Sequence, residues 1–295
     1  SYHLIETPAR RGKMSGRYIL RLSLPALIIL ISSAHILSTQ GISSRYGDIW
    51  TIAQQTKINK YGKYSECEKQ PPQSLKCEIG DTNSLPTFII MGDSHSPAPA
   101  TTFDIVAQEL SMKGLLFWRS GCAPLVGYSR IDRNCDPSLA QTITDIPDTV
   151  EHAYLVARWP LIVEEKGLDY GREPNPGRIY IADNAQTPDP GPEVLKKGLE
   201  ATITMLKSHN IDVTILYPFP ELGFDPIAQI LRNPETFPTI SREKVNTRQA
   251  QTRTILDSII KKHGLDNIDA IDYLCDLTHC HTRKIDTIFY MDDDH

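Results

Sequence analysis

The sequence lacks the surplus of basic residues that nucleic-acid-binding proteins carry. Its 295 residues include 31 Lys or Arg and 36 Asp or Glu, which gives a formal net charge of −5. Without a basic face the chain offers no electrostatic footprint for phosphate backbones, which argues against nucleic acid as a partner. It also lacks internal repeats and long low-complexity tracts, and its 40% hydrophobic residues exclude a disordered chain. We therefore expect one sizeable folded domain with an appendage.

An apolar run near the N-terminus contains no Asp, Glu, Lys or Arg between Leu22 and Leu37. A helix rises about 1.5 Å per residue, so crossing the hydrocarbon layer takes roughly 20 residues. The alternative is a buried amphipathic helix of a soluble domain. Because the run is apolar on all faces, we predict one transmembrane helix over residues 18–39.

Basic residues flank this run on one side. Arg10, Arg11, Lys13, Arg17 and Arg21 precede or begin it, and only Arg45 follows closely. Since positive flanks stay in the cytoplasm, residues 1–17 are expected on the cytoplasmic side. The large domain that follows would then be periplasmic or extracellular.

The six cysteines form three pairs that are close in sequence: Cys67 with Cys77, Cys122 with Cys135, and Cys275 with Cys280. Short loops close most readily, and such disulfides persist in an oxidising compartment. The alternative is a metal site built from Cys275, His279, Cys280 and His281. No second ligand pair stands at zinc-finger spacing, so we predict disulfides and no metal.

Strand-like and helix-like segments alternate after residue 85. The predicted strands cover residues 87–91, 115–118, 152–157, 178–182, 212–217 and 267–273, and the predicted helices cover 103–113, 193–209 and 241–263. This alternation favours an α/β fold with a parallel sheet covered on both faces. We expect a linker over residues 40–84 and the folded domain over 85–295.

The segment Met91–Ser96 (MGDSHS) follows the first predicted strand and precedes a helix. Gly92 permits a tight turn, which would leave the Ser94 hydroxyl at a strand-to-helix corner. The backbone N–H of Ser94, near a helix N-terminus, could stabilise an oxyanion. The alternative is that Asp93 or Ser94 only caps the helix.

A second candidate segment, Tyr290–His295 (YMDDDH), ends the sequence. A serine hydroxyl needs a base to remove its proton, and His295 can be that base. A carboxylate must orient the imidazole, and Asp292 stands three residues before it. Asp293 and Asp294 are closer in sequence but less able to face the ring. The alternative is a solvated acidic run.

The sequence Gly92–His95 after a strand, with Asp-x-x-His near the end, resembles the SGNH hydrolase superfamily. This resemblance implies a flavodoxin-like three-layer α/β/α fold. It also implies Ser94 as the nucleophile, Asp292 as the orienting acid and His295 as the base.

Further segments are similar to the SGNH domain fused to membrane acyltransferase-3 proteins. They are Ser120–Leu125 (SGCAPL), Leu155–Trp159 (LVARW) and Tyr217–Gly223 (YPFPELG). Residues 1–10 (SYHLIETPAR) are similar to the end of an acyltransferase-3 membrane domain. We therefore expect residues 1–17 to end such a domain and the chain to be the C-terminal part of a longer protein.

This resemblance implies an O-acetyltransferase at the bacterial inner membrane, with the SGNH domain in the periplasm. Its partners would be its own acyltransferase membrane domain, the membrane, and a surface glycan such as lipopolysaccharide O-antigen or exopolysaccharide. Acetyl-CoA would be the ultimate acetyl donor, with no cofactor bound by the domain itself. An acetylesterase and a non-catalytic glycan-orienting module remain alternatives.

The chain departs from the family pattern at the oxyanion hole. SGNH enzymes usually supply a glycine and an asparagine, and Gly121 matches the glycine. Arg158 and Trp159 stand where a Gly-x-Asn-Asp motif would follow the third strand. Arg158 or Asn184 could donate instead; equally, Arg158 could form a structural ion pair and Asn184 a turn.

Overall fold

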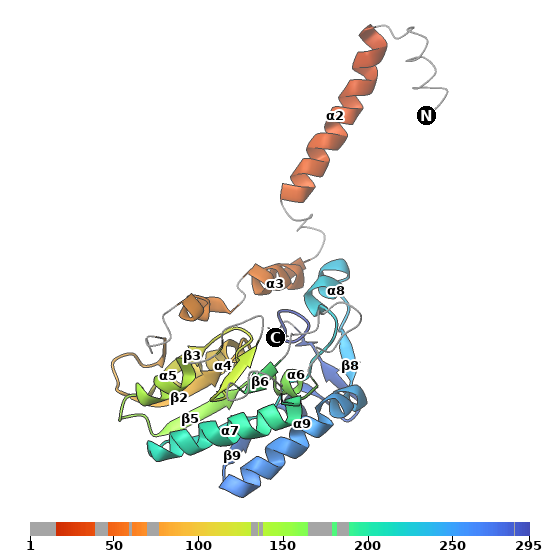
Figure 1. Ribbon diagram of the computed structural model, residues 1–295. Helices are drawn as coiled ribbons and strands as arrows, with labels where there is room; N and C mark the ends of the chain where they lie inside the picture. Colours follow the sequence, from red (N-terminus) through yellow and green to blue (C-terminus); the bar gives the residue numbers. More distant parts are fainter. Residues whose placement is uncertain are drawn as a thin grey trace. The chain divides into compact units, whose positions relative to one another are not determined.

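The computed structural model describes residues 16–38, 47–58, 61–69, 77–130, 135, 138–164, 179–181, 189–285 and 287–295 (Figure 1). The chain divides into two compact units, Ser1–Thr51 and Ile52–His295. Helix α3 (Gly47–Ile58) contains the division.

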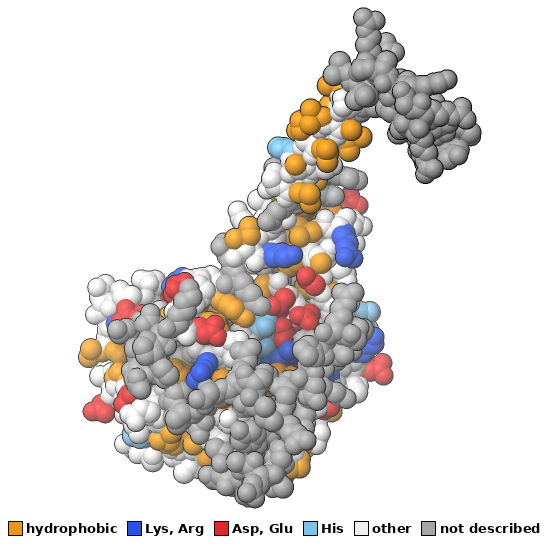
Figure 2. All heavy atoms as spheres, turned by 45° about the horizontal axis from the view of Figure 1, so that its top comes forward, with side chains coloured by type: hydrophobic (Ala, Val, Ile, Leu, Met, Phe, Trp, Pro, Cys, Tyr) orange, Lys and Arg blue, Asp and Glu red, His pale blue; other side chains and the backbone are white. Residues whose placement is uncertain are grey.

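The first unit contains helix α2 (Gly16–Ser38), and Figure 2 shows hydrophobic side chains along its described part. Ile29 and Leu37 are among its exposed residues. Among the helices of the described residues, none combines the length and apolarity that a membrane crossing requires. The segment predicted as a transmembrane helix over residues 18–39 is helical as α2, and its role as a membrane span stays a prediction.

The second unit is built on a six-stranded sheet. The strands lie in the order β1 (Glu78–Gly80), β3 (Lys113–Trp118), β2 (Pro86–Gly92), β5 (His152–Val156), β7 (Asp212–Leu216) and β9 (Asp266–Ile268). Only the edge strand β1 is antiparallel to its neighbour within this sheet. Taken in chain order, the parallel strands run 2-1-3-4-5, as in flavodoxin-like folds, whose ligands bind beyond the carboxyl ends of the strands.

Helices cover the sheet on both faces because its central strands are apolar on both sides. Along β2, Ile89 and Met91 belong to one hydrophobic cluster, whereas Phe88 and Ile90 belong to another. The first cluster is covered by α5 (Ser138–Thr144), α6 (Trp159–Glu164), α7 (Gly191–Ser208) and α9 (Arg242–His263), and the second by α4 (Pro97–Glu109). Helices α7 and α9 lie side by side (Figure 1). The predicted α/β fold with a mostly parallel sheet is confirmed.

Three strands differ from the prediction. The strand expected over residues 267–273 is confined to β9, which ends at Ile268, and helix α10 (Ile271–Leu274) follows it. Strand β6 (Ile179–Ile181), expected in the main sheet, pairs instead with β4 (Tyr128–Arg130) in a separate antiparallel ribbon. A short apolar run indicates a strand without indicating its partner, which explains the error. Strand β1 joins the main sheet although it lies in the predicted linker. Two short 3-10 helices, η3 (Gly62–Tyr64) and η4 (Cys67–Lys69), precede it.

Apart from α9 and β9, the part of this unit after β7 consists of short elements. These are α8 (Pro226–Arg232), β8 (Thr239–Ser241), α10 (Ile271–Leu274), β10 (His279–His281), β11 (Arg283–Lys284) and β12 (Thr287–Ile288). Strand β8 pairs with β10, and β11 pairs with β12. All three expected disulfides, Cys67–Cys77, Cys122–Cys135 and Cys275–Cys280, are formed. We call residues 271–295 the tail segment.

Candidate active site

Ser94 lies at the corner between β2 and α4, beyond the carboxyl end of a central strand. The corner requires glycine at position 92, because a Cβ there would lie 2.1 Å from both the Ser96 hydroxyl and the Val156 carbonyl oxygen. The Ser94 side chain is buried. The sequence therefore places this hydroxyl on a rigid element of the sheet.

The buried Asp93 carboxylate braces the same corner. It accepts hydrogen bonds from the backbone N–H groups of His95 and Arg158, each at 2.9 Å. The Ser96 hydroxyl donates to the Asp93 carbonyl at 2.8 Å. Burial alone would raise the pKa of Asp93, but the charge and hydrogen bonds of His95 and the N–H of Arg158 hold it below its usual value. Asp93 therefore serves as a structural anion rather than a proton carrier.

The tail segment brings His295 to this corner across 201 positions of sequence. His295 Nε2 lies 2.7 Å from Ser94 Oγ. His295 Nδ1 lies 2.8 and 3.0 Å from the two carboxylate oxygens of Asp292. These partners favour the tautomer in which Nδ1–H donates to the carboxylate and Nε2 accepts the Ser94 proton. The structure thus assembles all three predicted residues in one hydrogen-bonded chain.

Asp294 is a second carboxylate on the same imidazole. Its Oδ1 lies 2.8 Å from His295 Nδ1, and its side chain is buried. The expectation that Asp294 is less able than Asp292 to face the ring is wrong. Asp292 accepts the backbone N–H groups of Asp294 and His295, at 3.2 and 2.8 Å. The resulting turn directs the Asp294 carboxylate back to the ring.

A buried ion network holds Asp294 in turn. Arg158 Nη1 lies 2.5 Å from Asp294 Oδ2, and Arg158 Nε pairs with Glu221. Glu221 also pairs with Arg248 Nε at 2.5 Å. Glu221 and Arg248 were not predicted from the sequence as site residues. The one available signal was that Arg158 and Glu221 lie in the family-like segments Leu155–Trp159 and Tyr217–Gly223.

The surroundings of His295 favour its protonated form. Burial alone would lower its pKa, but hydrogen bonds to Asp292 and Asp294 and the charges of these carboxylates raise it to about 9. The His95 ring packs against it with centroids 4.5 Å apart, and Tyr61 makes an edge contact at 5.8 Å. An imidazolium formed during a reaction would therefore be well stabilised.

The oxyanion donors stay predictions. Gly121, with φ of 69°, follows β3, the neighbour of β2. The Arg158 guanidinium is engaged with Glu221 and Asp294 as described, which matches the alternative of a structural ion-pair former. Asn184 lies outside the described residues.

Some ligand-type atoms of the site also lie close enough together for a metal ion. One group is His95, Asp294 and His295, with ligand atoms within 4.8 Å of one another. Asp294 already binds Arg158, and His295 already binds Ser94. A metal here would compete with the hydrogen-bonded chain, so the absence of a catalytic metal stays our expectation.

Comparisons with known proteins identify the family and a similar fold. Residues 65–295 match the family model described as "SGNH domain (fused to AT3 domains)". The periplasmic domain of a lipopolysaccharide acetyltransferase from Salmonella ser. Paratyphi A has a similar structure, with a TM-score of 0.55 and 16% identity over 84% of this chain and 90% of that one.

A putative acylhydrolase from Bacteroides fragilis is more distant, with a TM-score of 0.38 and 12% identity over 72% of this chain and 78% of that one. No curated protein matches in sequence. Because the family model covers most of the chain, the protein belongs to the family of SGNH domains fused to AT3 domains.

Proposed function

We propose that this domain is a serine-dependent O-acetyltransferase that moves an acetyl group, through an acetyl-serine, to a sugar hydroxyl of a bacterial surface glycan. The observation that carries the proposal is the 2.7 Å contact between Ser94 Oγ and His295 Nε2, with carboxylates on the opposite ring nitrogen. This is the arrangement that an activated serine nucleophile requires.

In the first step, Ser94 Oγ attacks the acetyl carbonyl carbon of the donor while its proton passes to His295 Nε2. The carbonyl oxygen becomes an oxyanion, for which the N–H groups of Ser94 and Gly121 are the proposed donors. The intermediate collapses, the donor's leaving group takes the proton from His295, and an ester on Ser94 remains.

In the second step, the acceptor hydroxyl attacks this ester while His295 takes the hydroxyl proton. Collapse of the intermediate forms the acetylated sugar, and His295 returns the proton to Ser94. Water in place of the sugar would give hydrolysis, so a weak esterase activity is expected whenever the acceptor is missing.

Asp292 and Asp294 share the orienting role in this proposal. Both carboxylates lie 2.8 Å from the same ring nitrogen. Asp292 also shapes the turn that presents the ring, and Asp294 connects the ring to Arg158. We assign Arg158 to positioning Asp294, because its Nε and Nη1 already bind carboxylates.

The family supports the proposed setting of the domain. We propose that the domain acts in the periplasm beside a fused acyltransferase membrane domain at the bacterial inner membrane. That membrane domain would deliver acetyl groups that originate from acetyl-CoA, so the domain itself needs no bound cofactor. The acceptor is a glycan of the cell surface, such as lipopolysaccharide or exopolysaccharide.

Ser94→Ala tests the proposal most directly. We expect hydrolysis of p-nitrophenyl acetate by the chain to fall by at least about 10³-fold, because the nucleophile and its proton path act as a unit. Acetyl content of the surface polysaccharide, measured by NMR in cells carrying the full-length protein, should fall to the level of a deletion strain. Ser208→Ala, which alters an exposed serine at the end of α7, is the matched control.

The outcomes separate the competing functions. Unchanged polysaccharide acetylation in the Ser94→Ala strain would overturn the acyl-serine mechanism. Polysaccharide acetylation that increases in the Ser94→Ala strain would instead identify an acetylesterase. Labelling of Ser94 by a fluorophosphonate would exclude a purely glycan-orienting module.

A further inference from the structure

A pocket of about 1130 Å³ lies in the C-terminal part of the second unit, and no member of the Ser94 site lines it. Its lining includes three aromatic residues, Phe237, Tyr273 and Phe289, and three basic ones, His281, Arg283 and Lys284. Tyr273 is 88% exposed, which is unusual for an aromatic side chain in a folded domain. The pocket thus presents aromatic surface and polar groups together.

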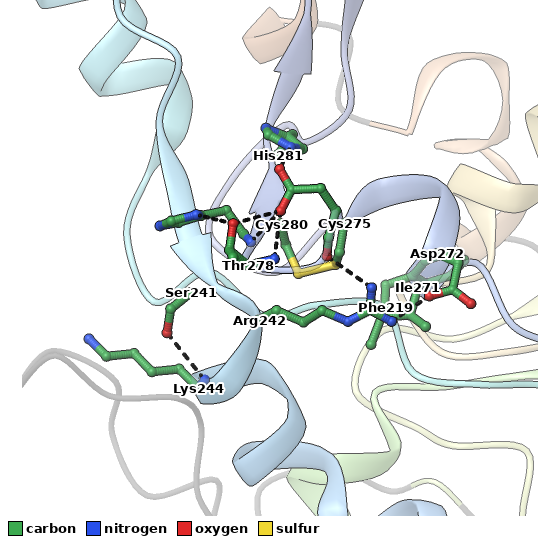
Figure 3. The surroundings of a disulfide bond; sticks show 12 residues. Phe219, Ser241, Arg242, Lys244, Ile271, Asp272, Cys275, Thr278, Cys280 and His281 are labelled. Atoms are coloured by element: carbon green, nitrogen blue, oxygen red, sulfur yellow. Dashed lines mark hydrogen bonds and ion pairs between the residues drawn. A yellow bond between two sulfur atoms is a disulfide. The ribbon is translucent and has the colours of Figure 1, made fainter.

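The pocket wall is fixed before any ligand arrives. The disulfide Cys275–Cys280 joins the end of α10 to β10 (Figure 3). Asp276 accepts the N–H groups of Thr278 and His279, each at 2.7 Å, and pairs with His281 Nε2 at 2.9 Å. These bonds hold the pKa of Asp276 well below its usual value. A preformed wall lowers the entropic cost of binding.

Two further contacts fix side chains of the pocket lining. Arg242 pairs with Asp272, and Figure 3 shows Arg242 extending toward it. The buried Arg283 places its guanidinium 3.8 Å from the centroid of the Phe237 ring. The planar guanidinium of Arg283 and the face of the Phe237 ring are therefore held together in the pocket lining.

These groups match the chemistry of a sugar chain. A pyranose ring has apolar C–H faces, which pack on aromatic rings, and hydroxyls that both donate and accept hydrogen bonds. The pocket supplies carboxylates at Asp272 and Asp276 as acceptors, and Lys284 and His281 as donors. A site meant for another protein would instead be flatter and depleted of charge at its centre.

The pocket is joined to the proposed catalytic site by a few residues of chain. Phe289 lines the pocket, and its N–H donates to the Thr282 carbonyl at 2.9 Å. Asp292 follows three residues later, so their Cα atoms are at most about 11 Å apart. The buried Tyr290 fixes the connection, and Met291 N–H donates to the His295 carbonyl at 2.7 Å.

We infer that this pocket is a carbohydrate subsite, which holds a segment of the acceptor glycan while another sugar of the same chain reaches Ser94. The inference rests on the proposed function, since it assigns the pocket to that acceptor. It makes Tyr273 and Lys284 determinants of acceptor affinity and leaves the chemistry at Ser94 unaffected.

The test uses the de-O-acetylated surface polysaccharide of the source cells as the probe. Saturation-transfer NMR measures its binding to the Ser94→Ala chain, which cannot turn it over. Adding Tyr273→Ala or Lys284→Ala to this chain should weaken binding about tenfold, and adding Leu277→Ala should not. Leu277 is the matched control because it is 93% exposed, is close in sequence, and lies outside the pocket lining.

Activity gives an independent readout. On the otherwise unchanged chain, Tyr273→Ala should leave p-nitrophenyl acetate hydrolysis at the unsubstituted rate, which also shows that the chain folds. In cells with the full-length protein, the same variant should reduce acetylation of the polysaccharide. Polysaccharide binding that is equal with and without the Tyr273 and Lys284 substitutions would overturn the subsite.

The two proposals fail in different ways. Loss of cellular acetylation in Tyr273→Ala with unchanged polysaccharide binding would overturn the sugar subsite and point to a docking surface for a protein domain. Binding that depends on Tyr273, in a protein whose Ser94→Ala variant still acetylates, would uphold the subsite and overturn the acyl-serine mechanism.

Discussion

Ser94 and His295 meet at one hydrogen bond, but two different kinds of structure position them. Ser94 sits at the end of β2, a central strand whose side chains are buried on both faces. His295 ends the tail segment, which has only short strands and a one-turn helix. The nucleophile is held by hydrophobic packing of the sheet, whereas the base is held by ion pairs and hydrogen bonds at the end of a segment with a smaller hydrophobic cluster of its own, which includes Ile271 and Tyr290.

This difference determines how each half of the site responds to substitution. Hydrophobic packing spreads its free energy over many contacts, so most single changes near β2 alter it little. A buried ion network concentrates its contribution in few groups, and removing one partner leaves another charge buried and unpaired. The half that holds His295, which comprises the tail segment and the ion network behind Asp294, should therefore be the more sensitive one.

The largest effect is expected at Glu221, which two arginines share. Glu221→Ala leaves the partly buried Arg158 and the buried Arg248 without this carboxylate, so we expect the free energy of unfolding to fall by about 3–5 kcal/mol. Urea denaturation measures it. As the control, Asp272→Ala removes an exposed partner of Arg242 and should cost no more than about 1 kcal/mol. Equal losses in the two variants would contradict a special role for the buried network.

Gly92→Ala tests the Ser94 half. The added Cβ would meet the Val156 carbonyl oxygen at 2.1 Å, and a backbone atom of the neighbouring strand cannot move away cheaply. We expect a loss of about 1–3 kcal/mol with esterase activity falling in parallel. Gly264→Ala is the control, since φ is 59° there but nothing lies within 4 Å. It should cost about 1 kcal/mol, and a larger loss there than at Gly92 would refute the steric argument.

Sequence patterns were sufficient for the sheet half of the site. A buried strand, a glycine and a serine before a helix are local signals, and they placed β2 and Ser94 correctly. The same local signals failed for β6, because an apolar run of three residues does not specify its partner strand. For α2 they predicted the helical character correctly, and the membrane span stays a prediction.

For the tail segment, sequence reasoning found His295 and Asp292 through their spacing but not the role of Asp294. The i to i+3 spacing of Asp292 and His295 indicates that their side chains can meet. The direction of the Asp294 side chain depends on the irregular backbone of this turn, which the sequence does not specify. Glu221 and Arg248 were missed because ion pairs across 27 positions leave no periodic signal. Ion pairs between residues far apart in the sequence therefore limit how much of the His295 half of the site can be predicted.

The smallest expected effect is a shift in the pH dependence of activity. With the pKa of His295 at about 9, the histidine is mostly protonated at neutral pH, whereas a base must be neutral. We therefore expect kcat/KM for p-nitrophenyl acetate to rise with pH up to about 9. Asp294→Asn removes one of two carboxylates on Nδ1, so the rising limb should move to lower pH by about one pH unit.

Stability should show the opposite dependence on pH. The folded-state pKa of His295 exceeds the ordinary 6.5, so its contribution is fully present below that value and is lost as pH rises through about 9. Thermal melting between pH 6 and 10 measures this loss, which Asp294→Asn should reduce. Asp225→Asn, at the N-cap of α8, is the control and should shift neither profile. If the pH range over which kcat/KM rises is unchanged in Asp294→Asn, then Asp292 alone sets the basicity of His295. The Asp294 carboxylate would then only anchor the tail segment.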